Sequence, residues 1–125
     1  MAGRSTRSLG TEGEQIAVRF LQANNYTILK TNYRVGRMGE IDIIAINDDY
    51  ICFIEVKTRS SYSFGAPSEA VTFEKQKKIR MIATVYLSNT GNMDKNIRFD
   101  VVGILKKNND SRYETESINL IKNAF

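Results

Sequence analysis

The sequence predicts a single α/β domain in which helices cover a mixed β-sheet. Its 125 residues, 42% of them hydrophobic, are enough for one packed core. Two segments carry apolar residues at helical spacing. Between them lie two consecutive runs that are apolar on both faces, which is typical of central strands covered on each side. Together with the flanking segments, these features predict the element order α-β-β-β-α-β-β.

The chain begins with a predicted arm and a predicted helix. Residues 1–9 are expected to form a flexible basic arm, so the domain is predicted to span residues 10–125. Thr11 and Glu14 have the spacing of a capping box, which predicts that the helix starts at Thr11. The helix is expected to end near Asn24–Asn25. Its apolar face consists of Ile16, Ala17, Phe20 and Leu21.

Three strands are predicted next. Tyr26–Val35 alternates loosely between apolar and polar residues, and residues 36–39 are expected to form a turn. The two strongly apolar runs are Glu40–Ile46 and Tyr50–Lys57. The three polar residues between these runs predict a hairpin, although its turn lacks the usual glycine.

The second helical region follows Pro67 and extends to about Leu87, with Thr72 as a candidate N-cap for its longer part. Its apolar stripe consists of Ile79, Ile82, Ala83, Tyr86 and Leu87.

Two further strands, Ile97–Leu105 and Tyr113–Ile121, are predicted near the C-terminus. The polar residues Lys106–Asp110 are expected to form the turn between them. Asp100 interrupts the first of these strands, and we expect it to be a buried partner of a basic side chain rather than a metal ligand.

The composition excludes several classes of chemistry. The chain has no histidine, so it carries no Ser-His, Cys-His or His-metal mechanism. A single cysteine, Cys52, excludes an ordinary zinc site and favours a reducing, intracellular setting. No signal peptide or membrane span is predicted, so we expect a cytoplasmic protein with no membrane partner. The net charge of +4 is compatible with a nucleic-acid partner, although ordinary cytosolic domains have a similar balance.

Three charged residues interrupt the two central strands. Glu55 and Lys57 are two residues apart, so their side chains point to the same face of the sheet. Asp42 interrupts the neighbouring strand, and a register that places it beside Glu55 brings two carboxylates together. Such a pocket attracts a hard divalent cation, Mg²⁺ or Mn²⁺. The alternative is a structural ion pair in which Lys57 neutralises Glu55 and Asp42 is paired elsewhere.

At these residues the sequence resembles the PD-(D/E)xK nuclease superfamily. Gly39–Ala45 contains the Asp, and Phe53–Arg59 contains the Glu-x-Lys, of that pattern. More narrowly, the chain is similar to the YraN-like family of predicted endonucleases, which resemble archaeal Holliday junction resolvases. The likeness extends from about Leu9 to Leu105. It also includes Gly13-Glu14, Phe64-Gly65, Ala70-Val71, Lys75 and Arg98-Phe99-Asp100.

The resemblance implies a restriction-endonuclease-like core, αβββαβ, with a mixed central sheet flanked by helices. It also implies a metal-dependent endonuclease that hydrolyses phosphodiester bonds in DNA, with branched or damaged structures as candidate substrates. Mg²⁺ or Mn²⁺ would be bound by Asp42, Glu55 and the backbone carbonyl of Val56, and Lys57 would position the attacking water. Ile41 stands where the superfamily pattern nominally has proline. A homodimer is compatible with the resolvase resemblance, and a non-catalytic or partner-dependent DNA-binding module on the same fold is the alternative function.

Other residues are expected to support this constellation. Glu14 resembles the helix glutamate that joins the metal site in junction resolvases, and its alternative role is the helix cap. Glu40 is expected to be a strand-edge charge, with a supporting role at the site as the alternative. Lys75 lies four residues before Ile79, in line with the apolar stripe of the second helix, so its side chain is expected to face the sheet and the site. A solvated charge run is the alternative for the lysines of this helix. The residues expected to contact phosphates without reading base sequence are Arg34, Arg37, Arg59, Lys75 and Lys78.

Overall fold

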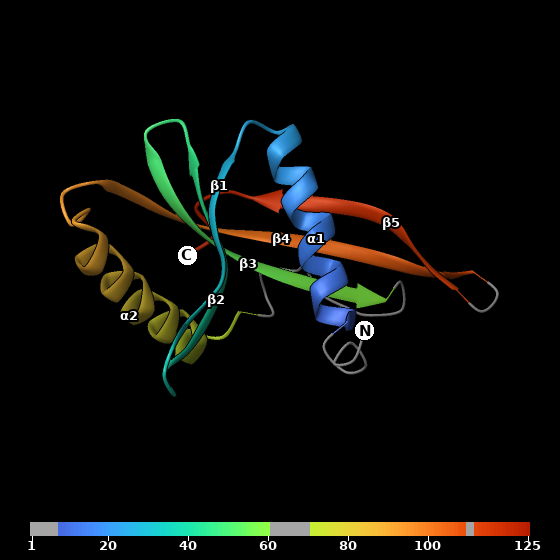
Figure 1. Cartoon of the computed structure of the whole chain (residues 1–125). Helices are drawn as coiled ribbons and strands as arrows, with labels where there is room; N and C mark the ends of the chain where they lie inside the picture. The colour runs from blue at the N-terminus through green and yellow to red at the C-terminus, as the bar shows by residue number, and fades with distance from the viewer. Residues whose placement is uncertain (1–7, 61–70, 110–111) are drawn as a thin grey trace.

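A five-stranded mixed sheet lies between two helices in the computed structural model, which describes residues 8–60, 71–109 and 112–125 (Figure 1). The predicted α/β class and the predicted order of elements are confirmed. Along the chain these elements are α1 (Ser8–Ala23), β1 (Thr27–Val35), β2 (Gly39–Asn47), β3 (Tyr50–Ser60), α2 (Phe73–Thr90), β4 (Asn96–Asn109) and β5 (Arg112–Ile121).

The strands lie in the sheet in their sequence order, β1-β2-β3-β4-β5. Neighbours pair antiparallel except for β3 and β4, which pair parallel. A parallel pair needs a crossover connection, and α2 lies in that connection. β2 and β3 are therefore internal strands, which explains why both of their faces are apolar.

Each helix covers one face of the sheet. On one side, Ala17 and Leu21 of α1 pack into a buried cluster with Ile43 of β2 and Ile54 of β3. On the other side, α2 packs against a cluster that includes Phe53. The residues of its predicted stripe are all buried there: Ile79, Ile82, Ala83, Tyr86 and Leu87. Neither helix is long and apolar enough to cross a membrane over the residues that the structure describes.

A local signal in the sequence correctly locates the start of α2, whereas the helix ends at Thr90 rather than near the predicted Leu87. The Thr72 hydroxyl accepts a hydrogen bond from the Lys75 amide at 3.1 Å, which confirms Thr72 as the N-cap. Gly91, in the left-handed region at φ 70°, ends the helix. The glycine-free turn between β2 and β3 is also formed, because Asp48 adopts a φ of 55°.

The start of α1 differs from the prediction. The helix already includes Ser8 and Leu9, and residues 1–7 of the predicted arm lie outside the described residues. Thr11 lies inside α1, so the predicted capping box is wrong. The apolar periodicity is continuous only from Ile16, and the mainly polar segment before it does not determine where the helix starts.

The hairpin of β4 and β5 is longer than predicted. β4 continues to Asn109 and still pairs with β5 at Arg112, so Lys106–Asn109 belong to a strand rather than to a turn. The pairing of β3 with β4 ends at Ser60, and beyond it β4 and β5 extend past the rest of the sheet as two strands (Figure 1). A two-stranded ribbon has no core side, so it needs no apolar alternation by which to be recognised.

Candidate active site

The candidate site lies where β2 and β3 separate. Their antiparallel ladder starts at the turn and ends with the pair Ile43–Ile54. Continuing that register by one pair places Asp42 opposite Glu55, the approach that the sequence left open. In place of a further ladder pair, a carboxylate oxygen of Asp42 accepts a hydrogen bond from the Val56 amide at 2.8 Å. This bond holds the Asp42 side chain between the two strands.

Lys57 and Lys75 both contact the buried carboxylate of Glu55. The Lys57 ammonium lies 3.6 Å from Oε2 of Glu55, and the Lys75 ammonium forms an ion pair with the same oxygen. Lys57 comes from β3 itself, whereas Lys75 comes from the first turn of α2. The face shared by Glu55 and Lys57, and the approach of Lys75 to the sheet, therefore agree with the sequence analysis. The contact of Lys57 with Glu55 is also the structural ion pair that the sequence allowed.

Three carboxylates meet beside this ion pair. Oxygen atoms of Glu14, Glu40 and Asp42 lie within 4.8 Å of one another, and all three residues are partly buried. Glu14 comes from α1, and Glu40 comes from the start of β2. Oxygen atoms are the ligands that Mg²⁺ and Mn²⁺ prefer, so this donor set fits a hard divalent cation.

Glu40 was not assigned as a ligand from the sequence, although a signal was present. It precedes Asp42 by two positions in one strand, the same spacing that places Glu55 and Lys57 on one face. Its carboxylate also pairs with the exposed Arg34 at 3.4 Å. Glu40 therefore belongs to the carboxylate cluster and also pairs with a basic residue of the neighbouring strand β1.

A glycine brings α1 close enough for Glu14 to reach the sheet. A Cβ atom at Gly13 would lie 2.8 Å from the hydroxyl oxygen of Thr58 on β3, closer than side chains allow. Gly13 thus permits a contact between helix and strand that other residues would widen. Because Glu14 is the next residue, its proximity to Asp42 depends on this close packing.

The electrostatics of the site differ on its two sides. Burial, together with repulsion from Glu55 and Glu14, raises the pKa of Asp42 to about 7, although the Val56 amide and Lys75 act in the opposite direction. Burial, followed by repulsion from Lys75, lowers the pKa of Lys57. Burial acts to lower the pKa of Lys75 as well, but the ion pair with Glu55 outweighs it and raises that pKa. Negative charge is therefore in excess around Asp42, while the lysines neutralise Glu55.

The residues predicted to contact phosphates lie at different depths. Arg37, in the turn between β1 and β2, and Lys78, on α2, are exposed. Arg59 follows Lys57 on β3 and is partly buried. Phe64, Gly65 and Ala70, which the resemblance included, lie outside the described residues.

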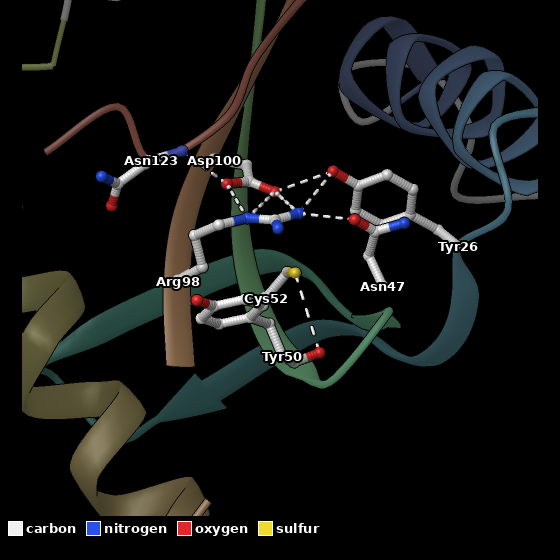
Figure 2. A network of polar contacts seen from close by, with 7 residues as sticks. All are labelled: Tyr26, Asn47, Tyr50, Cys52, Arg98, Asp100 and Asn123. Atoms are coloured by element: carbon white, nitrogen blue, oxygen red, sulfur yellow. Dashed lines mark hydrogen bonds and ion pairs between the residues drawn. The ribbon is translucent and has the colours of Figure 1, made fainter. Parts of the chain in front are cut away.

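A second charged network occupies the α1 side of the sheet near the turn between β2 and β3 (Figure 2). Asp100 is fully buried and pairs with Arg98, which confirms the expected basic partner; the Arg98 Nε lies 2.9 Å from the carboxylate. The Tyr26 hydroxyl and the backbone amide of Asn123 also donate to Asp100, each at 2.9 Å. Arg98 in turn donates to the side-chain oxygen of Asn47 at 2.9 Å.

This network joins β4 to three other parts of the chain, and its two charged side chains pair with each other and with polar groups of the protein. Among the residues that the structure describes, no buried side-chain nitrogen or oxygen lacks a hydrogen-bond partner. Because Asp100 is satisfied by donors from the protein, the network has the character of a structural link rather than of a metal site.

Comparison with known proteins finds relatives along most of the chain. Residues 13–104 match the family model described as Uncharacterised protein family UPF0102. A UPF0102 protein of Acetivibrio thermocellus is 50% identical over 119 residues, which cover 95% of this chain and 92% of that protein. UPF0102 proteins of Alkaliphilus oremlandii and Caldicellulosiruptor bescii are each 48% identical, over 121 and 120 residues, and each alignment covers 95% of this chain and 98% of the relative. The segment matched by the family model includes Glu14, Asp42, Glu55 and Lys57.

Proposed function

The chain belongs to the protein family UPF0102, and we propose that it is a metal-dependent endonuclease that hydrolyses phosphodiester bonds in DNA. The observation that carries the proposal is the meeting of Asp42, Glu55 and Lys57 where β2 and β3 separate, with Glu14 close to Asp42. The same residues match the PD-(D/E)xK pattern in the sequence. The order of elements from α1 to β4 agrees with the restriction-endonuclease-like core that this pattern implies.

In this proposal Mg²⁺ or Mn²⁺ would be held by Asp42 and Glu55, with the Val56 carbonyl as a further ligand. Glu14 and Glu40 would supply additional oxygen donors next to Asp42. As a Lewis acid, a bound cation would stabilise the negative charge that develops on the phosphate. The raised pKa of Asp42 supports this assignment, because a cation would relieve the repulsion among the carboxylates.

The basic residues of the site would perform the rest of the chemistry. Lys57 is partly buried beside Glu55, and its lowered pKa favours the neutral amine, the form that can accept a proton, more than in an exposed lysine. It would orient or deprotonate the attacking water. Lys75 would add positive charge near the phosphate oxygens. The Val56 amide would keep Asp42 in place during the reaction.

Contacts with the DNA backbone would come from basic residues around the site. Arg34, Arg37 and Lys78 are exposed, and Arg59 is partly buried on the strand that carries Lys57. Such residues position a nucleic acid without reading its base sequence. Branched or damaged DNA is the proposed substrate, on the strength of the likeness to junction resolvases, and a homodimer would match the two strands cut at a junction.

Cleavage of a labelled four-way junction, beside matched linear duplex and single strands, tests the function. The protein and its Glu55→Gln and Glu74→Gln variants are compared in EDTA, Mg²⁺ and Mn²⁺. Glu74 is an exposed glutamate of α2, so its variant makes the same chemical change away from the site. We expect metal-dependent cutting by the wild type and by Glu74→Gln, and a loss of at least ~100-fold in Glu55→Gln. A folded Glu55→Gln protein that cuts as fast as the wild type would refute the proposal.

One observation favours a second candidate, because the two lysines on Glu55 also form a self-contained ion-pair network. Under that candidate the charges serve the fold alone, and replacing them by apolar residues stabilises the protein. A lack of Mn²⁺ binding together with such stabilisation would support it. Binding of the junction without cutting, under every condition, would instead indicate a DNA-binding module.

A further inference from the structure

We propose that Lys75 is the counter-ion of Glu55 in the metal-free protein, and that a divalent cation and Lys75 compete for this carboxylate. The inference rests on the proposed cation site but not on cleavage. It assigns to α2 a role in deciding when Glu55 is available as a ligand.

The geometry gives Lys75 and Lys57 different freedom to move. Both ammonium groups contact the same oxygen of Glu55, whose side chain is only 5% exposed. Lys57 is 23% exposed and shares the strand of Glu55, whereas Lys75 is 41% exposed and reaches in from the helix. The backbone of Lys75 is anchored by the cap at Thr72. A rotation of its flexible side chain can therefore carry the ammonium into solvent without moving the helix.

Charge balance explains why Glu55 has such a partner. A buried carboxylate is costly unless it is paired or bound to a metal. The Lys57 ammonium lies 3.6 Å away, and Lys75 forms a second ion pair with the same carboxylate oxygen in the absence of a cation. A divalent cation beside Asp42 would repel both ammonium groups. Lys75 is the more exposed of the two, so it is the group that leaves.

The exchange couples cation binding to substrate binding. Once released from Glu55, the Lys75 ammonium can contact a phosphate at the mouth of the site. Because coupling between two ligands is reciprocal, a bound phosphate backbone that attracts Lys75 would also strengthen cation binding. The competition therefore ties the filling of the metal site to the presence of nucleic acid.

Calorimetric titration of Mn²⁺ in the absence of DNA gives the first test. We expect Lys75→Gln to bind Mn²⁺ about 10-fold more tightly than the wild type, equivalent to about 1.4 kcal/mol, since the competitor is gone. Lys75→Arg, which keeps the charge, should stay near the wild type. Lys77→Gln removes one exposed charge from the same helix turn and should change the affinity less than about 2-fold. Equal affinities in Lys75→Gln and Lys77→Gln would overturn the competition.

Chemical reactivity of individual lysines gives the second test. With a limiting amount of an acylating reagent, mass spectrometry should show that Lys75 becomes more reactive when Mn²⁺ is added, while Lys77 does not. In Glu55→Gln, Lys75 should be reactive without the cation.

The outcomes separate this inference from the proposed function. Mn²⁺ binding by the wild type with no change at Lys75 would leave the cation site standing and overturn the competition. An absence of Mn²⁺ binding in the wild type and in Lys75→Gln would overturn both.

Discussion

Asp42 is subject to two opposing influences. It accepts a hydrogen bond from the Val56 amide and so stabilises the point where two central strands separate. Burial and the nearby Glu55 and Glu14 nevertheless raise its pKa to about 7. Part of the Asp42 population is therefore protonated at neutral pH when no cation is present. A carboxyl group in this condition is typical of sites that bind a charged ligand or perform chemistry.

The raised pKa predicts a pH-dependent gain in stability for Asp42→Asn. In the unfolded chain the carboxyl has an ordinary pKa of about 3.9. The folded protein therefore holds an extra proton between that pH and about 7, and it loses stability as the pH rises through this window. Asparagine keeps an acceptor for the Val56 amide but has no charge. The stability that Asp42→Asn gains over the wild type should be larger at pH 8 than at pH 5, by up to about 3 kcal/mol. This difference follows from ~1.4 kcal/mol for each pH unit between pH 5 and the pKa of about 7.

Denaturant unfolding at the two pH values, without divalent ions, measures this effect. Asp94→Asn changes an exposed aspartate and serves as the control, with an unaltered pH profile. Parallel profiles for the wild type and Asp42→Asn would contradict the prediction. Addition of Mn²⁺ at pH 8 should reduce the difference, since a cation stabilises the ionised carboxylate.

Among single residues, the sequence predicted best the relations that lie within one element. Period-2 spacing placed Glu55 and Lys57 on one face, and helical spacing directed Lys75 toward the sheet. The shared contact of both lysines with Glu55 has no such signal, because it depends on how α2 packs against the sheet. The spacing of Thr11 and Glu14 was misleading, because it matches a capping box but Glu14 instead lies near Asp42.

At the scale of elements, the close packing of α1 on β3 sets the position of Glu14. We predict that Gly13→Ala lowers the Mn²⁺ affinity by about 10-fold, because the added Cβ meets the Thr58 hydroxyl at 2.8 Å and displaces the helix. Removing that hydroxyl in the double variant Gly13→Ala, Thr58→Ala should restore the affinity. Thr58→Ala alone should bind as the wild type does.

The stability of these variants separates packing from helix propensity. Alanine favours a helix over glycine by ~0.5–1 kcal/mol, so Gly13→Ala loses little stability even where the helix has shifted. Calorimetric titration of all three variants, beside their unfolding free energies, gives the comparison. A wild-type affinity in Gly13→Ala would mean that Thr58 rotates away and that α1 does not move.

The elements themselves differ in how far the sequence predicted them. β2 and β3 were predicted well because they are buried on both faces, and a strand of this kind consists of a nearly continuous run of apolar residues. α2 was recognised from its stripe and its N-cap. The extension of β4 to Asn109 was missed because its pairing is between backbones and leaves no apolar pattern.

The whole molecule combines two charged networks, one in which every charge has a partner within the protein and one in which negative charge is in excess. The network at Asp100 links the residue before β1, the last residue of β2 and the C-terminal segment to β4, and its donors and acceptors match. The cluster at Asp42 instead brings several carboxylates together with an excess of negative charge. The first arrangement is suited to holding the fold, and the second is suited to a ligand that the protein does not itself supply.

This contrast predicts that the two networks respond differently to substitution. Asp100→Asn leaves the mostly buried Arg98 guanidinium without its carboxylate, which should cost about 3–5 kcal/mol of unfolding free energy. Tyr26→Phe removes the hydrogen bond that Tyr26 donates to Asp100 and the one that it accepts from Arg98, and should cost about 2 kcal/mol. Both variants, when folded, should bind Mn²⁺ as the wild type does, because the groups that shift the pKa of Asp42 lie elsewhere. Denaturant unfolding and Mn²⁺ titration of each variant measure the two properties separately. A stable Asp100→Asn protein, or a Tyr26→Phe protein with altered Mn²⁺ affinity, would show that the two networks are not divided in this way.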